Sequence, residues 1–593
     1  MKKNWHLAKN IPLDFQKKFP GYNPVVLQLL YNRGFRDAHQ IEEFLEPKYE
    51  KLSSPFELTD MDKAVSRILK SVAQEEKITI YADYDADAVT ACAVMYYGLK
   101  QLGATDVSYY IPDRFSEGYG MNLEAIRQIS SDGAKLMITV DCGINSVKEV
   151  ALANELGLDV IVTDHHHITG KLPKAVAVVN HKRDEREDLS GITGVGMAFK
   201  LVQALFFVLH PESYGEHKWK KPKLKLDKKT LTAAKEKLLP NTPPHWEKWL
   251  LDLVAIGTVA DIQSLLGESR ILVKYGLQVM GKTRWAGLKQ IFRNAGVDEF
   301  KKFDTFDIGF IIAPRINAAG RIQHADIALK LLISQTPEEA SMYAGQLEQL
   351  NTHRQRLTEQ IFSEARSQIE LQHHNKILVA IGEEWPKGVV GLVASRLVEE
   401  FNRPTVVLEK SNGQATGSGR SVGDFDLVEA LTHVEVHLER YGGHAGAAGL
   451  TLKEDKIELF RQAITDFAQD KIKDALPEKL RSIDAVLEPG EVSLKLVKEL
   501  KKFEPHGPGN PPPVFLLSGL RLENLKLVGV KGKHLRVKAS KDKHVLNLIG
   551  FSKGYLEKQY RPGESVDVLV EPSENVWNGR TDLQLRILDI KKS

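Results

Sequence analysis

The stretch KITIYADYDADAVTACAV, Lys77–Val94, decides the fold of the first half of the chain. Its β-branched and apolar opening residues predict a buried strand, and the residues after Ala86 predict a helix. Between the two stand three aspartates, Asp83, Asp85 and Asp87, spaced two residues apart. So much negative charge at the end of a buried strand is costly unless something compensates it.

The same alternation continues as far as Asn180. Further strands are predicted at VSYYI, LMITVD, DVIVTD and AVAVVN, with helical stretches such as NSVKEVALANELG between them. Continuous apolar strands that alternate with helices indicate a mostly parallel sheet covered on both faces. In such sheets ligands bind outside the carboxyl ends of the strands.

Metal-ligating residue types follow three of these strands. After the three aspartates come Asp141 in ITVDCG and the run Asp164, His165, His166 and His167 in VTDHHH, and Asp261 closes LVAIGTVADI as a fourth candidate. Converging carboxylates would repel one another, which favours a bound cation. Oxygen-rich ligands with one or two imidazoles suit Mn²⁺ or Mg²⁺, and two such ions would activate water. Any single aspartate could instead only cap the next helix, and the His run could be surface decoration.

Length and composition set further limits. A chain of 593 residues predicts about three or four domains. The 81 basic and 78 acidic residues leave a net charge of +3, so a nucleic-acid surface would have to be a local patch. Cys92 and Cys142 form no pattern, which argues against disulfides and a Cys-type zinc site. The start lacks an apolar signal core, and no apolar run of about 18 residues occurs, so we expect a soluble, cytoplasmic protein that makes no membrane contact.

The motifs DYDAD, VDCG, TDHH and TVAD resemble the four motifs of the DHH phosphoesterase superfamily. Over nearly the whole chain the sequence is similar to the RecJ family within it, which comprises single-strand-specific 5′→3′ exonucleases. The wider resemblance rests on IPDRFSEGYG (111–120), TGVGMAFKL (193–201), PRINAAGR (314–321), WPKGVVGLVASRL (385–397), GSGRS (417–421) and YGGHAGAAG (441–449).

The resemblance implies roles for individual residues. The implied metal ligands are Asp85, Asp87, Asp141, His165 and Asp261, and the implied catalytic neighbours are His166 and Asp83. Arg114, Ser418 and Arg420 are similar to contacts of a 5′-phosphate, and Arg315, Asn317, Arg321 and His444 to further substrate contacts. Two positions depart from the family pattern: Ala88 and Ala82 stand where glycine is usual. A glycine would permit a positive φ or a close backbone approach.

The expected class is α/β with an added barrel. Residues 1–70 are expected to pack on a DHH catalytic domain (71–324), which a connecting helix (325–372) joins to a second α/β domain of the DHHA1 type (373–480). The resemblance implies a C-terminal OB-fold (481–593), in which Lys533, Arg536 and Trp577 are possible DNA contacts. A basic insert near 211–245, with HKWKKPKLKLDKK at 217–229, either follows a phosphate backbone or is a solvated loop.

The function that these observations predict is a 5′→3′ exonuclease on single-stranded DNA. It would use two Mn²⁺ or Mg²⁺ ions, release mononucleotides, and act in recombination and repair, with a helicase and a single-strand-binding protein as implied partners. One alternative is another DHH phosphoesterase acting on oligoribonucleotides or a small nucleotide. The other is a non-enzymatic, Cdc45-like DNA-binding protein, against which the complete ligand set argues and which only Ala88 favours.

Overall fold

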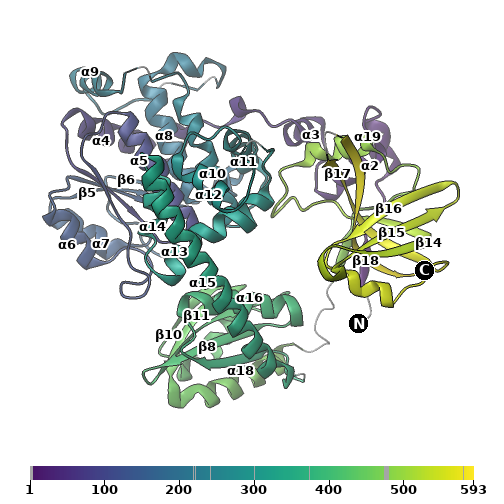
Figure 1. The fold of residues 1–593 in the computed structure, drawn as a ribbon. Coiled ribbons are helices and arrows are strands. Elements are labelled where there is room, and N and C mark those ends of the chain that lie inside the picture. The colour runs from purple at the N-terminus through teal and green to yellow at the C-terminus, as the bar shows by residue number, and fades with distance from the viewer. Residues whose placement is uncertain are drawn as a thin grey trace. The chain divides into compact units, whose positions relative to one another are not determined.

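The computed structural model describes residues 4–217, 219–220, 222–240, 242–299, 301–372, 374–472, 480–577 and 580–593. The chain forms two compact units (Figure 1). The first is Tyr49–Pro477, and the second joins Met1–Lys48 to Glu478–Ser593. Each unit is described by itself below.

A five-stranded sheet forms the centre of the catalytic part of the first unit. Its order is β3-β2-β4-β5-β6, and every neighbouring pair is parallel. The strands are β2 (Ile78–Ala82), β3 (Val107–Tyr110), β4 (Leu136–Val140), β5 (Asp159–Thr163) and β6 (Ala177–Val179). β2 and β4 are buried at every position, as the continuous apolar runs predict. The predicted parallel sheet is confirmed.

Helices cover both faces of this sheet. On one face Ile80 and Ile138 pack against α4 (Met61–Ala73), α5 (Ala86–Gln101) and α8 (Gly194–Leu209). On the other face Met137 and Val160 pack against α6 (Leu123–Ser131) and α7 (Val147–Glu155). Because successive side chains of a strand point to opposite faces, each strand contributes to both cores.

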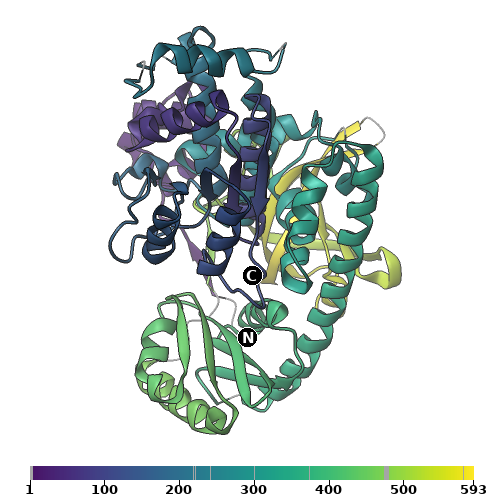
Figure 2. The same cartoon turned by 90° about the vertical axis from the view of Figure 1, so that its left-hand side faces the viewer.

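A helical part completes the catalytic domain. It contains α9 (Lys228–Lys237), α10 (Leu251–Ala260), α11 (Gly267–Met280), α12 (Ala286–Asn294), the π-helical turn η6 (Asp307–Ile312), α13 (Ala313–Ile322) and α14 (Asp326–Leu332). The 34-residue helix α15 (Pro337–Glu370) then leads into the next domain (Figure 2). α15 starts with a Thr336 cap, whose hydroxyl accepts from the Glu339 amide, and with a proline in the first turn.

The second domain of this unit is built on a mixed sheet of order β10-β11-β9-β8-β7. Its strands are β7 (Leu378–Glu383), β8 (Thr405–Ser411), β9 (Gln414–Arg420), β10 (Arg440–His444) and β11 (Ala447–Lys453). Only β7 and β8 pair in parallel. The helices are α16 (Lys387–Phe401), α17 (Leu427–His433) and α18 (Ile457–Lys471).

The other unit contains a closed barrel. Strands β14 (Phe515–Val528), β15 (His534–Lys541), β16 (His544–Gly550), β18 (Arg580–Lys592) and β17 (Ser565–Trp577) follow one another, and β14 also pairs with β17. This arrangement confirms the expected OB-fold. The unit also contains β13 (Ala485–Val486) and α19 (Leu494–Leu500).

The boundary between the N-terminal segment and the catalytic unit lies at Lys48, before the boundary expected at residue 70. Strand β1 (Trp5–Leu7) pairs in parallel with β12 (Arg481–Ile483), and the Trp5 indole donates to Asp589 Oδ2 at 3.1 Å. Helices α1 (Leu13–Lys18), α2 (Pro24–Asn32) and α3 (Ala38–Leu45) belong to the same unit. Only residues from Tyr49 onward, including α4, join the catalytic core.

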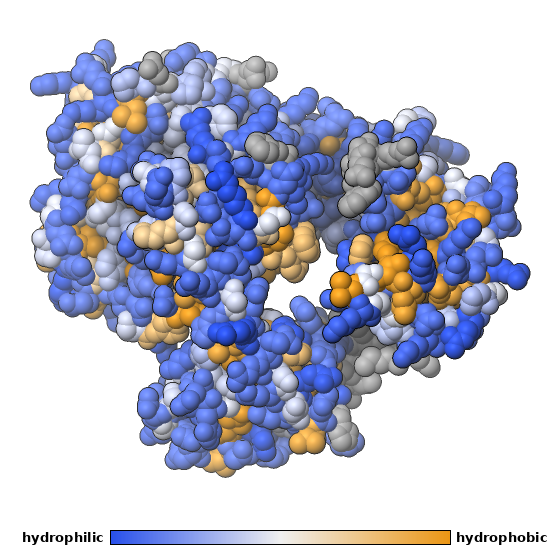
Figure 3. Space-filling model, viewed as in Figure 1, coloured by the Kyte–Doolittle hydropathy of each residue, from blue (hydrophilic) through white to orange (hydrophobic). Residues whose placement is uncertain are grey.

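The molecular face in Figure 3 is mostly hydrophilic, with apolar residues in separate patches. In the part of the chain that the structure describes, every helix is too short or too polar to cross a bilayer.

Candidate metal centre and substrate contacts

The candidate ligands come from loops at one edge of the parallel sheet. Asp83 follows β2, Asp141 follows β4, and Asp164 and His165 follow β5. Parallel strands bring these carboxyl ends together. Asp261 is different, because it caps the C-terminus of the buried helix α10 instead of ending a strand.

The His165 imidazole lies at the middle of the cluster. Its Nε2 is 3.1 Å from Asp141 Oδ1, 3.7 Å from Asp261 Oδ2 and 4.0 Å from Asp87 Oδ2. Two groups of three residues have ligand atoms within 4.8 Å of one another, namely Asp141 with His165 and His166, and Asp87 with His165 and Asp261. The two groups share His165 and therefore lie next to each other.

Asp85 and Asp83 lie beside these two groups. Asp85 caps the N-terminus of α5, and its Oδ1 accepts from the amides of Asp87 at 2.9 Å and Ala88 at 3.1 Å. Asp83 is buried, and burial together with the charge of Asp85 raises its pKa to about 8. The structure therefore brings all five implied ligands and Asp83 into one cluster.

The first turn of α8 holds Asp87 in place. The Thr193 hydroxyl and the Val195 amide donate to Asp87 Oδ1 at 3.0 and 3.1 Å, and the Gly194 amide donates to Oδ2 at 2.7 Å. A helix N-terminus suits a carboxylate because its free amides and its dipole both favour negative charge.

Two glycines allow this close approach. A Cβ at Gly194 would lie 2.3 Å from Asp141 Cβ, and a Cβ at Gly257 would lie 2.6 Å from Asp87 Oδ1. Any side chain at either position would displace a carboxylate of the cluster.

Asp164 orients His166. Its Oδ1 lies 2.8 Å from His166 Nδ1 and accepts from the His165 and His166 amides, while Oδ2 accepts from the Ile144 amide. Burial opposes the charged imidazole, but the hydrogen bond to Asp164 and the negative charges of Asp164, Asp261 and Asp85 together outweigh it and raise the pKa of His166. The ring's Nε2 is 3.1 Å from the Tyr119 hydroxyl. His166 can thus carry positive charge at the rim of the cluster.

The donor set fits divalent cations. Burial and the neighbouring carboxylates raise the pKa values of Asp87 and Asp141 well above the usual range. Among the described residues, Asp141 Oδ1 and Asp261 Oδ2 are buried and accept no hydrogen bond. Burial lowers the pKa of His165 to about 3, which keeps the imidazole neutral, as a metal ligand must be. Carboxylate oxygens with one or two imidazoles suit Mn²⁺ or Mg²⁺.

The two departures from the usual glycines cause no strain. Ala88 lies in the first turn of α5 and Ala82 in β2, and both have negative φ. Both are fully buried. No left-handed conformation is needed at either position.

A cluster of guanidinium groups interacts electrostatically with the metal loop, since the charges of Arg321 and Arg114 act on Asp85 and Asp83. Arg321 of α13 is half-buried, and desolvation together with the charges of Arg114 and Arg354 lowers its pKa to about 10. Burial and Arg114 also lower the pKa of Arg420, which donates to Ser418 Oγ at 2.6 Å. Arginines that destabilise one another's charge favour a bound anion.

Other predicted substrate residues make structural contacts. Arg315 donates two hydrogen bonds to the Glu348 carboxylate of α15, from Nε at 2.7 Å and from Nη2 at 3.2 Å. Asn317 Oδ1 accepts from the Ala86 amide at 2.9 Å and so fastens α13 to the metal loop. His444 is exposed at the end of β10. The pKa of His167 is lowered, first by the charge of Lys182 and to a smaller extent by that of His444.

Sequence reasoning assigned no role to Thr193, Tyr119 or Arg354. Thr193 precedes an apolar helical run, which is an N-cap signal. Arg354 lies on α15 and donates to Asn351, while its buried Nε has no hydrogen-bond partner among the described residues. No local pattern distinguishes Arg354 from the other charged residues of that helix.

In the barrel unit, Lys533 and Arg536 are exposed at the start of β15 and on it. The Trp577 side chain lies outside the described part of the structure, as do Lys218 and Lys221 of the basic insert. Trp219 of that insert stacks on Tyr214 with ring centroids 5.4 Å apart and donates to the Leu52 carbonyl, so it packs inward.

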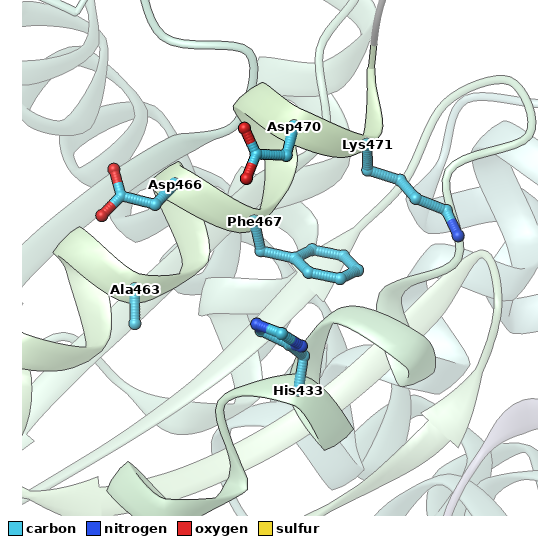
Figure 4. A pocket seen from close by; sticks show the side chains of 6 residues that line it. All are labelled: His433, Ala463, Asp466, Phe467, Asp470 and Lys471. Atoms are coloured by element: carbon cyan, nitrogen blue, oxygen red, sulfur yellow. The ribbon is translucent and has the colours of Figure 1, made fainter.

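A separate hollow of about 460 Å³ lies between α17 and α18 (Figure 4). His433, Ala463, Asp466, Phe467, Asp470 and Lys471 line it. The His433 and Phe467 rings lie 4.7 Å apart, and Lys471 pairs with Glu429 at 2.5 Å. It contains no residue of the metal or arginine clusters.

The fold and the cluster define a phosphoesterase of the DHH class. Family models match three parts of the chain: the DHH family N-terminal domain over residues 77–235, the DHHA1 domain over 374–470, and the RecJ OB domain over 483–589. Two curated relatives are named single-stranded-DNA-specific exonuclease RecJ. The one from Bacillus subtilis is 36% identical over 95% of this chain and 68% of its own length, and the one from Escherichia coli is 33% identical over 88% of each. The chain therefore belongs to the RecJ family.

Solved structures agree with this assignment. RecJ of Thermus thermophilus in complex with Mn²⁺ is similar with a TM-score of 0.80 and 31% identity, covering all of this chain and 80% of that one. Its complex with Mg²⁺ gives a TM-score of 0.75 and 29% identity, covering all of this chain and 79% of that one.

Proposed function

We propose that this chain is a metal-dependent exonuclease that removes nucleotides from the 5′ end of single-stranded DNA. The observation that carries the proposal is the pair of ligand groups that share His165, together with the arginines Arg321 and Arg114, whose charges act on Asp85 and Asp83 of the metal loop. The names of the curated relatives, and the Mn²⁺ and Mg²⁺ in the similar solved structures, support it.

Two ions, Mn²⁺ or Mg²⁺, would be held by Asp85, Asp87, Asp141, His165 and Asp261. Bound there, they would supply an activated water and stabilise the charge that develops on the phosphodiester oxygens. The protein contributes the fixed positions of its ligands, since Thr193 and the α8 amides hold Asp87 before any ion binds. His166, charged and oriented by Asp164, stabilises negative charge at the phosphate, and Asp83 lies beside Asp85 as its catalytic neighbour.

The 5′-terminal phosphate is taken by Arg114, Ser418 and Arg420, with Arg321 beside them. A site for a terminal phosphate next to the metal centre fixes the polarity of cleavage and the release of mononucleotides. Arg315, Asn317 and His444 position the first nucleotides. In the barrel unit Lys533, Arg536 and Trp577 hold the strand by charge and stacking.

In the cell the enzyme trims single strands during recombination and repair in the cytoplasm. A helicase would expose the strand, and a single-strand-binding protein would cover it. This context is supported by family membership alone.

The test is degradation of DNA that carries a label at the 5′ or the 3′ end, as single strand or duplex, with Mn²⁺, Mg²⁺ or a chelator. The wild type should release the 5′ label from single strands only, and only with metal. Asp141→Ala should be inactive, whereas Asp466→Ala, an exposed aspartate on α18, should match the wild type. A wild-type protein that binds the strand but cuts it with neither ion would instead establish the non-enzymatic alternative.

A further inference from the structure

Two phenylalanines stand exposed beside the candidate metal centre. Phe306 and Phe310 are 59% and 71% exposed, and their rings stack with centroids 4.8 Å apart and planes at 22°. Ile262, 73% exposed, follows Asp261 directly. We call the two phenylalanines, Phe306 and Phe310, the aromatic platform. Stacked rings so exposed point to a binding surface.

The local sequence holds the platform outward. Phe306 and Phe310 are four residues apart at the turn η6, while Ile308 and Ile312 of the same turn are buried in the core. Asp307 fixes the turn, because it pairs with Lys301 Nζ at 2.6 Å and accepts from the Asp304 amide at 3.0 Å. Turns of π-helix occur frequently at functional sites.

The platform is continuous with the candidate active site. η6 packs against α10 through Gly309 and Val259, and α10 ends at Asp261, a candidate metal ligand. In the other direction η6 runs directly into α13, which carries Arg321. At about 1.5 Å per residue, the helical path from Phe310 to Arg321 spans about 16 Å. A strand held at the arginine cluster reaches the platform within a few nucleotides.

Two carboxylates near the platform are paired with cations, which reduces their repulsion of a phosphate backbone. Asp307 is paired with Lys301, and Glu348 of α15 is paired with Arg315 of α13. Stacked phenylalanine rings offer an open aromatic face, on which any base can stack whatever its sequence.

We propose that the aromatic platform stacks bases of the single strand a few nucleotides beyond the 5′ end. This inference rests on the proposed function and adds a source of strand selectivity. Bases in a duplex are already stacked and paired, so only a single strand can place a base on Phe310. The occupant is thus the substrate itself.

The experiment uses the full chain with Phe310→Leu, which keeps an apolar side chain but removes the ring, and Phe310→Trp, which keeps a ring. Leu459→Ala, another exposed apolar position, on α18, is the matched control. Each protein is tested on 5′-phosphorylated single strands of about 20 nucleotides, either intact or with one abasic residue moved stepwise from the 5′ end. Mn²⁺ binding reports separately on the metal centre.

On intact strands Phe310→Leu should raise KM roughly 5- to 100-fold, the range expected for one lost base stack, while Phe310→Trp and Leu459→Ala stay near the wild type. In the wild type an abasic residue at one or two positions should raise KM similarly, and the same residue should have no further effect in Phe310→Leu. Equal sensitivity of both proteins to every abasic position would overturn the inference, as would an unchanged KM in Phe310→Leu. A wild type that degrades no single strand would refute the proposed function instead.

Discussion

Removing the Thr193 hydroxyl tests the metal centre, because that hydroxyl donates to one candidate metal ligand, Asp87. In Thr193→Val, Asp87 Oδ1 loses the hydrogen bond of 3.0 Å but keeps the Val195 amide, and Oδ2 keeps the Gly194 amide. A hydrogen bond to a charged group contributes about 1.5–3 kcal/mol. Without that hydrogen bond Asp87 must be ordered as the ion binds, and the lost free energy then weakens metal binding. The Mn²⁺ dissociation constant should rise roughly 10- to 100-fold, as found for other residues that orient metal ligands.

Isothermal titration with Mn²⁺ measures this dissociation constant, and exonuclease rates at increasing Mn²⁺ show whether saturating metal restores turnover, as we expect. Thr193→Ser is the matched control, since it keeps the hydroxyl and should bind Mn²⁺ like the wild type. The reasoning fails if Thr193→Val binds Mn²⁺ within about twofold of the wild type, or if Thr193→Ser is equally impaired.

Four further substitutions test other features. Glu268→Gln leaves the buried Lys200 charge, 2.6 Å from that carboxylate, without its partner and should lower the unfolding free energy by about 3–5 kcal/mol in urea; a normal urea midpoint would contradict this. Ala88→Gly should leave turnover unchanged and destabilise α5 by about 0.5–1 kcal/mol, because Ala88 already has a helical φ; faster turnover would show that the position limits catalysis. Burial raises the pKa of Asp252 to about 6 from 3.8, so the folded state binds the extra proton and wild-type stability falls as pH rises from about 4 to about 6. Asp252→Asn should therefore gain roughly 3 kcal/mol relative to the wild type across that window, and a pH-independent difference in urea unfolding would refute the assignment. Arg420→Ala should raise KM roughly 10- to 100-fold for strands with a 5′-phosphate and little for 5′-hydroxyl strands; an equal effect on both would exclude a terminal-phosphate contact.

The parallel sheet and the loops that carry Asp85, Asp141 and His165 could be predicted from the sequence, because apolar runs and the residues that follow them are local signals. Asp261 was a candidate because it closes the apolar run LVAIGTVADI, and its motif supported that choice. Its position depends on a buried helix that enters the cluster from outside the sheet, and no local pattern encodes that packing. The contact of Thr193 with Asp87 joins residues 106 positions apart and is likewise a property of the tertiary fold.

The substrate residues show a further limit of sequence reasoning. Motifs identified Arg315 and Asn317, but only the structure reveals that Glu348 and the Ala86 amide engage them. The N-terminal boundary differs from the expected one for a related reason. Strand β1 has three residues, too few for a reliable periodicity, and its partner β12 lies near the other end of the sequence.

That pairing of β1 with β12 has a consequence for synthesis on the ribosome. Residues 1–48 emerge first, but the strands they join begin only after residue 478. At about 5–20 residues per second, the ribosome needs roughly 20–90 s to make the intervening 429 residues (477 − 48). The catalytic unit can fold meanwhile, whereas the N-terminal helices, with Phe15, Leu29 and Phe44 in their core, wait with apolar surface uncovered. The order of translation thus leaves the N-terminal segment without its partner strands while most of the chain is being made.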